Sequence, residues 1–113
     1  LTGPTHVCRI NDGQFESFVI RPEDYGFTSC DLKELIGGSP EDNAKITRDI
    51  LSGAEQGAKR DVVILNAALC LASALGKEIS EGVRMATELI DSGKALEKLE
   101  AFIRATNEVE ELF

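Results

Sequence analysis

The sequence is poor in aromatic residues, in histidine and in positive charge. It has no Trp, one Tyr and one His, and its 12 Lys and Arg are outnumbered by 20 Asp and Glu, for a net charge of −8. Nucleic acids and anionic membrane surfaces require a basic footprint, so this composition excludes both as partners. His6 has no second His or Cys at ligand spacing, which argues against a zinc site and favours a strand-surface side chain.

The three cysteines, Cys8, Cys30 and Cys70, form no CxxC pair. An odd number without such spacing argues against a disulfide framework and favours a reducing cytoplasm. Cys70 lies in an apolar run, where it is expected to be buried. No basic stretch followed by an apolar segment marks a signal peptide near the start. The chain begins at Leu1 and not at Met, which suggests a piece of a longer protein.

A length of 113 residues is enough for one domain with one core. Residues 5–10 and 14–20 alternate between polar and apolar, and Asp12-Gly13 between them is a strong hairpin signal. The second strand places Phe15 and Phe18 on opposite faces, which predicts either a bulge or cover on both sides. We therefore expect an antiparallel β-hairpin over 1–20, a connector over 21–38 and a helical part over 39–113.

Residues 60–76 contain the longest apolar run, in which only Asn66 and Ser73 between residues 62 and 75 are clearly polar. The run is too long for a strand and too short for a bilayer, so it predicts a helix buried on every side. Asn66 is then a buried amide that bonds to a neighbouring loop, near Asn43. Arg60 at the unfavourable end of the helix dipole is expected to pair with a carboxylate elsewhere.

Further helices follow from periodicity and capping signals. Ser39 is expected to cap a helix over 40–52, and Ser80 a helix over 81–92 in which Gly82 allows close packing. A last helix runs from residue 94 towards residue 112. Its apolar face comprises Ala95, Leu99, Phe102, Thr106 and Val109. The connector carries two shorter helical segments, one opened by Pro22 and ended by Gly26, and one over 31–36.

Two segments invite a chemical interpretation. Gly37-Gly38-Ser39 before a helix could cradle a phosphate, but no P-loop pattern is present and the following acids favour a simple cap. Glu23-Asp24 could contact a metal, although adjacent acids at a turn are more typical of capping. Nothing supplies a nucleophile with a base. The sequence therefore predicts no catalytic, substrate-binding or metal residue, and gives Asn43, Arg60 and Asn66 structural roles.

An ordered series of motifs nevertheless resembles one enzyme family, over nearly the whole chain. These are Pro22-Glu23-Asp24-Tyr25-Gly26-Phe27, Gly37-Gly38-Ser39-Pro40-Glu41-Asp42-Asn43-Ala44, Ile50-Leu51-Ser52-Gly53, Arg60-Asp61 to Leu65-Asn66-Ala67-Ala68, and Asp91-Ser92-Gly93-Lys94-Ala95. The series resembles the carboxyl-terminal third of anthranilate phosphoribosyltransferase, an enzyme of tryptophan biosynthesis.

The resemblance implies a transferase that uses magnesium to move a phosphoribosyl group from phosphoribosyl diphosphate to anthranilate. It implies a larger α/β domain of which this chain is the end, so that the isolated fragment is α+β: a hairpin followed by four to five helices. The family's diphosphate loop, its anthranilate contacts and its metal-binding acids would all fall before Leu1. The fragment is then a scaffold that binds no magnesium or substrate itself and is inactive alone.

Two alternatives remain at this point. One is a fragment of a related pyrimidine-nucleoside phosphorylase, which would share the α/β domain. The other is a stand-alone interaction module that keeps the fold without the chemistry. For the isolated fragment, an apolar surface left without its sheet is expected to be exposed and to cause self-association.

Overall fold

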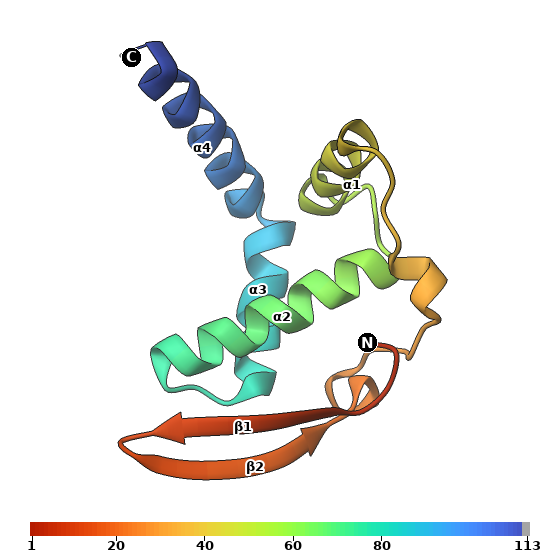
Figure 1. Ribbon diagram of the computed structural model, residues 1–113, viewed down its shortest axis with the longest axis vertical. Coiled ribbons are helices and arrows are strands. Elements are labelled where there is room, and N and C mark those ends of the chain that lie inside the picture. Colours follow the sequence, from red (N-terminus) through yellow and green to blue (C-terminus); the bar gives the residue numbers. More distant parts are fainter. Residues whose placement is uncertain (112–113) are drawn as a thin grey trace. The chain divides into compact units, whose positions relative to one another are not determined.

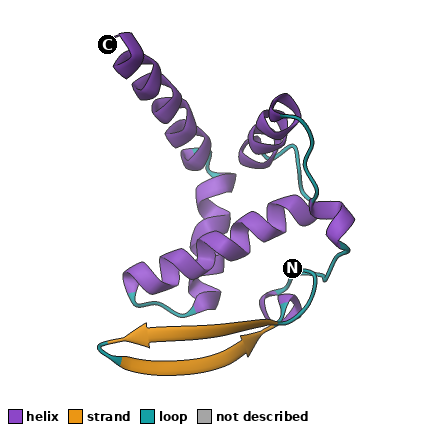
Figure 2. Ribbon diagram, viewed as in Figure 1, coloured by secondary structure: helices purple, strands orange, loops and turns teal. Residues whose placement is uncertain are grey.

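The computed structural model describes residues 1–111, which fold into a β-hairpin with two short 3₁₀ helices and four α-helices (Figures 1 and 2). The chain divides into two compact units, Leu1–Ile36 and the part from Gly37 onward. This composition of elements confirms the α+β fold class expected for the fragment.

The first unit is built on the predicted hairpin. Strands β1 (Thr5–Asn11) and β2 (Gln14–Ile20) pair in an antiparallel register that runs without interruption from Thr5↔Ile20 to Asn11↔Gln14. The two-residue turn places both Asp12 (φ 52°) and Gly13 (φ 77°) in the left-handed region, as a twist-matched hairpin turn requires. The continuous register rules out a bulge, which was one of the two alternatives for this strand, because the tight turn fixes the pairing.

Two 3₁₀ helices follow the hairpin. The first, η1 (Pro22–Tyr25), ends at Gly26 with φ 83°, and the backbone N–H of Phe27 donates to the carbonyl of Pro22 at 3.0 Å. The second, η2 (Leu32–Leu35), lies within the predicted helical segment over 31–36. Both confirm short helical turns where Pro, Gly and acidic residues indicated them.

The second unit contains α1 (Pro40–Ser52), α2 (Ala58–Leu75), α3 (Ile79–Asp91) and α4 (Lys94–Glu111). The main packing interface is between α2 and α3, which are bent by 117° relative to each other across a short turn, and α1 lies against α3 and α4. Gly82 makes the crossing possible, since a Cβ there would lie 2.3 Å from the carbonyl oxygen of Ala68. The close packing expected at Gly82 is therefore confirmed.

The prediction that the apolar helix is buried on every side is wrong. Helix α2 buries one side, composed of Arg60, Ile64, Leu65, Ala68 and Ala72. Val63, Leu75 and Cys70 are exposed, so the expected burial of the Cys70 thiol is also wrong. The physical reason is that α3 is the main helix packed against α2, and one helix covers one face.

Helix α3 begins earlier than its capping signal indicated. Glu78 is the N-cap residue and Ser80 lies inside the helix, because Ile79 is drawn into the core as a helical residue. In α4, Phe102 is 64% exposed, while the Val109 side chain of the predicted apolar face lies outside the described residues.

Within the described residues, no helix taken singly has the length and apolar character to cross a bilayer. Helices α2 and α3 pass that test only as a bent pair, and only by length and composition.

Candidate functional site

The most deeply buried charge in the second unit is the guanidinium of Arg60, which is 8% exposed. Its Nη2 lies 3.0 Å from Oδ1 of Asp91 at the end of α3. This ion pair confirms the expectation that Arg60 is paired with a carboxylate from elsewhere in the chain. Its Nη1 is buried without a hydrogen-bond partner among the described residues. The pair links the start of α2 to the end of α3, and its role is therefore structural.

Asp61 follows Arg60 in the first turn of α2 and is half-buried. Burial raises the pKa of this carboxyl above its ordinary value, and the charge of Glu55 raises it further, while Arg60 acts in the opposite direction.

The loop before α1 is closed by its own side chains. Oδ1 of Asn43 accepts the Gly38 N–H at 2.9 Å, and Nδ2 of Asn43 donates to the Gly38 carbonyl at 3.2 Å. Ser39 and Asp42 form a reciprocal capping box, with both bonds at 3.1 Å. The donors that would hold a phosphate are thus already used, which confirms the capping interpretation and gives Asn43 a local structural contact.

Asn66 does not have the predicted environment. It lies on the exposed side of α2, and its Nδ2 donates to the carbonyl of Val62 within the same helix at 2.8 Å. The predicted buried amide bonded to a loop near Asn43 is therefore wrong, since Asn43 is engaged with Gly38 instead. An exposed polar residue satisfied by its own helix needs no tertiary partner.

The carboxylates of Glu23 and Asp24 in the connector accept hydrogen bonds from residues of the same segment. The Ser29 hydroxyl donates to Oε1 of Glu23 at 2.5 Å, and this bond lowers the pKa of the Glu23 carboxyl. Oδ2 of Asp24 accepts the Arg21 N–H at 3.0 Å, as a capping acid does. Among the side chains that the structure describes, no group of three or more His, Cys, Asp or Glu is gathered in metal-binding geometry.

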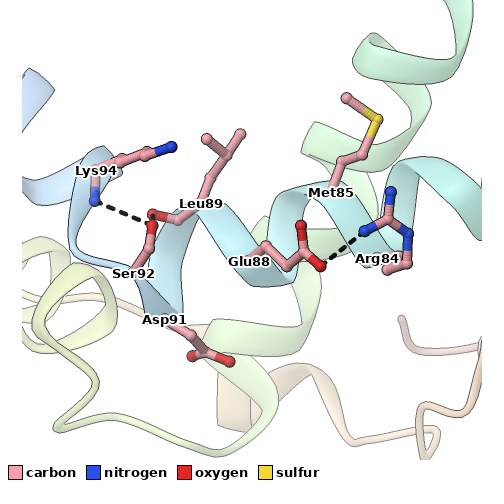
Figure 3. Close-up of a pocket in the computed structure, with 7 residues that line it drawn as sticks. All are labelled: Arg84, Met85, Glu88, Leu89, Asp91, Ser92 and Lys94. Atoms are coloured by element: carbon pink, nitrogen blue, oxygen red, sulfur yellow. Dashed lines mark hydrogen bonds and ion pairs between the residues drawn. The ribbon is translucent and has the colours of Figure 1, made fainter.

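A shallow pocket of about 640 Å³ lies along the exposed side of α3 and the start of α4 (Figure 3). Its lining residues are Arg84, Met85, Glu88, Leu89, Asp91, Ser92 and Lys94. Arg84 is held by Glu81 and by Glu88, the latter at 2.7 Å, which raises the pKa of the guanidinium and lowers that of Glu81. No sequence pattern indicated this pocket, because its residues lie on the solvent-facing side of α3 and the start of α4 and have no motif in common. Of the charged side chains that line it, Arg84 is paired with Glu88, and Asp91 is paired with Arg60 from α2.

His6 stands alone on the exposed surface of β1, as the sequence predicted. It borders a second, smaller hollow of about 330 Å³ formed by the hairpin.

Comparison with known proteins places this architecture. The chain is 48% identical over 109 residues, 96% of its length, to an anthranilate phosphoribosyltransferase of Endomicrobium trichonymphae, and 49% identical over 110 residues to that of Geobacter sulfurreducens. These matches cover 32% and 31% of the relatives. The chain therefore spans about a third of the length of the curated relatives it matches.

Solved structures agree in fold. The crystal structure of anthranilate phosphoribosyltransferase from Thermus thermophilus matches 92% of this chain with a TM-score of 0.82 and 32% identity, and the chain covers 31% of it. The Saccharomyces cerevisiae enzyme in complex with 4-fluoroanthranilate matches 94% with a TM-score of 0.84 and 28% identity, again over 31% of that protein. These matches confirm the resemblance inferred from the motifs. Residues 1–96 match the model of the glycosyl transferase family, a/b domain, and the chain belongs to this family.

Proposed function

We propose that this chain is the carboxyl-terminal third of an anthranilate phosphoribosyltransferase, an enzyme of tryptophan biosynthesis. One observation carries the proposal: relatives with that name align with 96% of the chain at 48% and 49% identity. The same names favour this enzyme over a pyrimidine-nucleoside phosphorylase and over a stand-alone interaction module. Residues 1–113 would form the end of the α/β domain, with the hairpin over 1–20, the connector over 21–38 and the helical part over 39–113.

The role of the chain in that enzyme is structural. The side chains that looked chemically useful are engaged in capping and ion pairing: Asn43 with Gly38, Glu23 with Ser29, and Arg60 with Asp91. Phosphoribosyl diphosphate, anthranilate and magnesium would be bound by the rest of the enzyme. A leaving diphosphate needs concentrated positive charge and oriented donors, which a chain with a net charge of −8 does not provide.

A chimera tests this proposal directly. In the Geobacter sulfurreducens relative, the 110 matching residues are replaced by this whole chain, and anthranilate-dependent consumption of phosphoribosyl diphosphate is measured. We expect the chimera to turn over and the isolated chain to show none. A folded chimera without this activity, or clear turnover by the isolated chain, would overturn the proposal. Thymidine phosphorolysis by the chimera serves as the control reaction for the phosphorylase alternative.

The proposal includes a cytoplasmic location and self-association of the isolated chain. Cys8, Cys30 and Cys70 are free thiols, two of them exposed, which suits a reducing compartment. Exposed apolar residues such as Ile10, Phe15 and Phe102 supply surface for self-association. Analytical ultracentrifugation of the isolated chain over a range of concentrations measures this, and a monomer at every concentration would contradict it.

A further inference from the structure

The tip of the hairpin holds the one Asp-Gly step of the sequence. Among the Asp and Asn residues, Asp12 alone is followed by Gly. Asp12 and Gly13 form the two-residue turn that joins β1 to β2 (Figure 1), and both residues are exposed. At such a step the backbone nitrogen after Asp has no side chain beside it, so the aspartyl carboxyl approaches it with little hindrance. The turn is therefore a place where a side chain and the main chain can react with each other.

Nothing in the structure holds the Asp12 carboxylate away from the main chain. Within the described part of the chain it takes part in no hydrogen bond or ion pair, since the base on the hairpin, Arg9, pairs with Glu16 at 3.8 Å. A Cβ at Gly13 would have no heavy atom beyond its chain neighbours within 4 Å, so the approach is also open. Other Asp carboxylates are each fixed by a partner, and these are Asp24, Asp42, Asp49 and Asp91.

The reaction available at this turn needs only the two residues and water. The nitrogen of Gly13 bonds to Cγ of Asp12, and its proton leaves with the carboxyl hydroxyl as one water, which closes a five-membered succinimide. A second water then opens the ring. Cleavage of the new N–Cγ bond restores Asp, whereas cleavage of the original peptide bond leaves the chain linked through Cγ, as isoaspartate. The composition of the chain is unchanged, and no electron is transferred.

We propose that Asp12 and Gly13 form a covalent modification site, at which isoaspartate forms in the folded chain without prior unfolding. The free carboxyl, the open nitrogen and the exposed turn together supply what the cyclisation needs. The inference concerns the chemistry of the turn itself, so it stands or falls independently of the proposed function.

The modification alters the hairpin. Both turn residues have positive φ, and this tight geometry sets the closing pair of Asn11 with Gln14. Isoaspartate adds one methylene to the main chain of the turn, so the same two-residue closure is lost. We expect the backbone amides of Asn11 and Gln14 to exchange their hydrogens about tenfold faster in the modified chain, because the end of the hairpin then opens more readily.

Ageing of the whole chain in neutral buffer tests the proposal. The buffer water is enriched in a heavy oxygen isotope, and peptides are analysed by mass spectrometry and by methylation with an isoaspartyl-specific methyltransferase. We expect the peptide that contains Asp12 to gain heavy oxygen and to become methylated. The step from Asp91 to Ser92 is the internal control, and it should react about tenfold more slowly or less, because Asp91 is paired with Arg60 and the helix end must open first.

The same measurement in urea shows whether the fold permits the reaction. Isoaspartate at Asp12 in the folded chain supports the proposal. Isoaspartate that forms only in the urea-unfolded chain would show that the turn protects the step and would overturn it, as would equal rates at Asp12 and Asp91 in the folded chain.

Two variants make the assignment specific while keeping the turn, because Gly-Gly and Asn-Gly both suit its left-handed positions. Asp12→Gly removes the carboxyl and should abolish methylation and uptake of heavy oxygen in the hairpin peptide. Asp12→Asn should give the same isoaspartate faster than the parent, with loss of ammonia in place of water, because a neutral amide accepts the nitrogen more readily than a carboxylate. Methylation of the hairpin peptide that persists in Asp12→Gly, or its absence in Asp12→Asn, would contradict the proposal.

Discussion

At the scale of single residues, the tightest constraint is Gly82. A methyl group there would meet the carbonyl carbon and oxygen of Ala68 at 3.0 and 2.3 Å, and backbone atoms of a packed helix cannot move aside alone. We expect Gly82→Ala to separate α2 from α3 and to lower the free energy of unfolding by roughly 2–3 kcal/mol. Urea denaturation followed by circular dichroism measures the change.

Gly3→Ala is the matched control for this substitution. No heavy atom lies within 4 Å of a Cβ at Gly3, and its φ is not in the left-handed region. The control should remain within about 0.5 kcal/mol of the parent. If Gly82→Ala were as stable as Gly3→Ala, the close crossing of the two helices would be wrong.

The Arg60–Asp91 pair gives a second residue-scale prediction. Asp91→Asn leaves a buried guanidinium without its anion, and we expect a loss of about 2 kcal/mol in the free energy of unfolding. The loss should fall short of that for a fully buried pair, because the Asp91 side chain is 57% exposed. Glu88→Gln on the same helix breaks only an exposed pair and should cost about 0.5 kcal/mol. Equal losses for the two variants in urea denaturation would deny the Arg60 pair its structural role.

Residues of the same helix show what sequence reasoning could and could not find. Arg60 was predictable as a paired base, because a cation is unfavourable at the start of a helix and needs an anion. The exposed position of Asn66 was not predictable, because an amide within an apolar run looks buried when the number of helices packed around that run is unknown. Its position on the exposed side of α2 follows from where α3 packs, which no local pattern specifies.

At the scale of elements, the start of α1 rests on its cap. The Ser39 hydroxyl accepts the N–H of Asp42, and the Asp42 carboxylate accepts the N–H of Ser39. Ser39→Ala removes the first of these bonds and should lower stability by about 1 kcal/mol. Ser73→Ala, at an exposed interior position of α2, should be neutral or slightly stabilising, because Ala has the higher helix propensity. Thermal unfolding measures the stability of both variants. If Ser73→Ala were less stable than Ser39→Ala, the capping role of Ser39 would be contradicted.

The element boundaries were predictable where local chemistry sets them and not where tertiary packing does. The hairpin and α1 are fixed by local chemistry, a turn with two left-handed residues in one case and a Ser-Pro capping box in the other, and both were predictable. The start of α3 was not, because Ser80 is a good cap in isolation while burial of Ile79 extends the helix past it. Tertiary packing overrides a local preference where an apolar side chain has a core to enter.

At the scale of the whole molecule, the order of motifs identified the family, whereas the chemistry could not be located. The predicted absence of a catalytic residue followed from the lack of a nucleophile with a base and from what the resemblance assigns to the preceding segments, and it stays a prediction. The strand pattern of the hairpin was interpreted correctly from the sequence: Phe15 and Phe18 do lie on opposite sides, and Phe15 is the more exposed.

The excess of acid over base makes the stability of the whole chain depend on pH, and two carboxyls contribute with opposite signs. Hydrogen bonding to Arg84 lowers the pKa of Glu81 in the folded state, so its contribution is present above its ordinary pKa of 4.5 and is lost as pH falls through the lowered value. Burial raises the pKa of Asp61 above 3.8, so its ionisation opposes folding as pH rises through that range.

We therefore expect Glu81→Gln to be less stable than the parent at pH 7 and Asp61→Asn to be more stable. Both differences should vanish in acid, once the two carboxyls are protonated in the folded and unfolded states alike. Urea denaturation of the parent and the two variants between pH 7 and about pH 3 gives the pH dependence. A loss of stability for Asp61→Asn at pH 7 would show that the helix dipole, which favours an acid in the first turn, outweighs burial at that carboxyl. A gain of stability for Glu81→Gln would contradict the stabilising role of the hydrogen bond to Arg84.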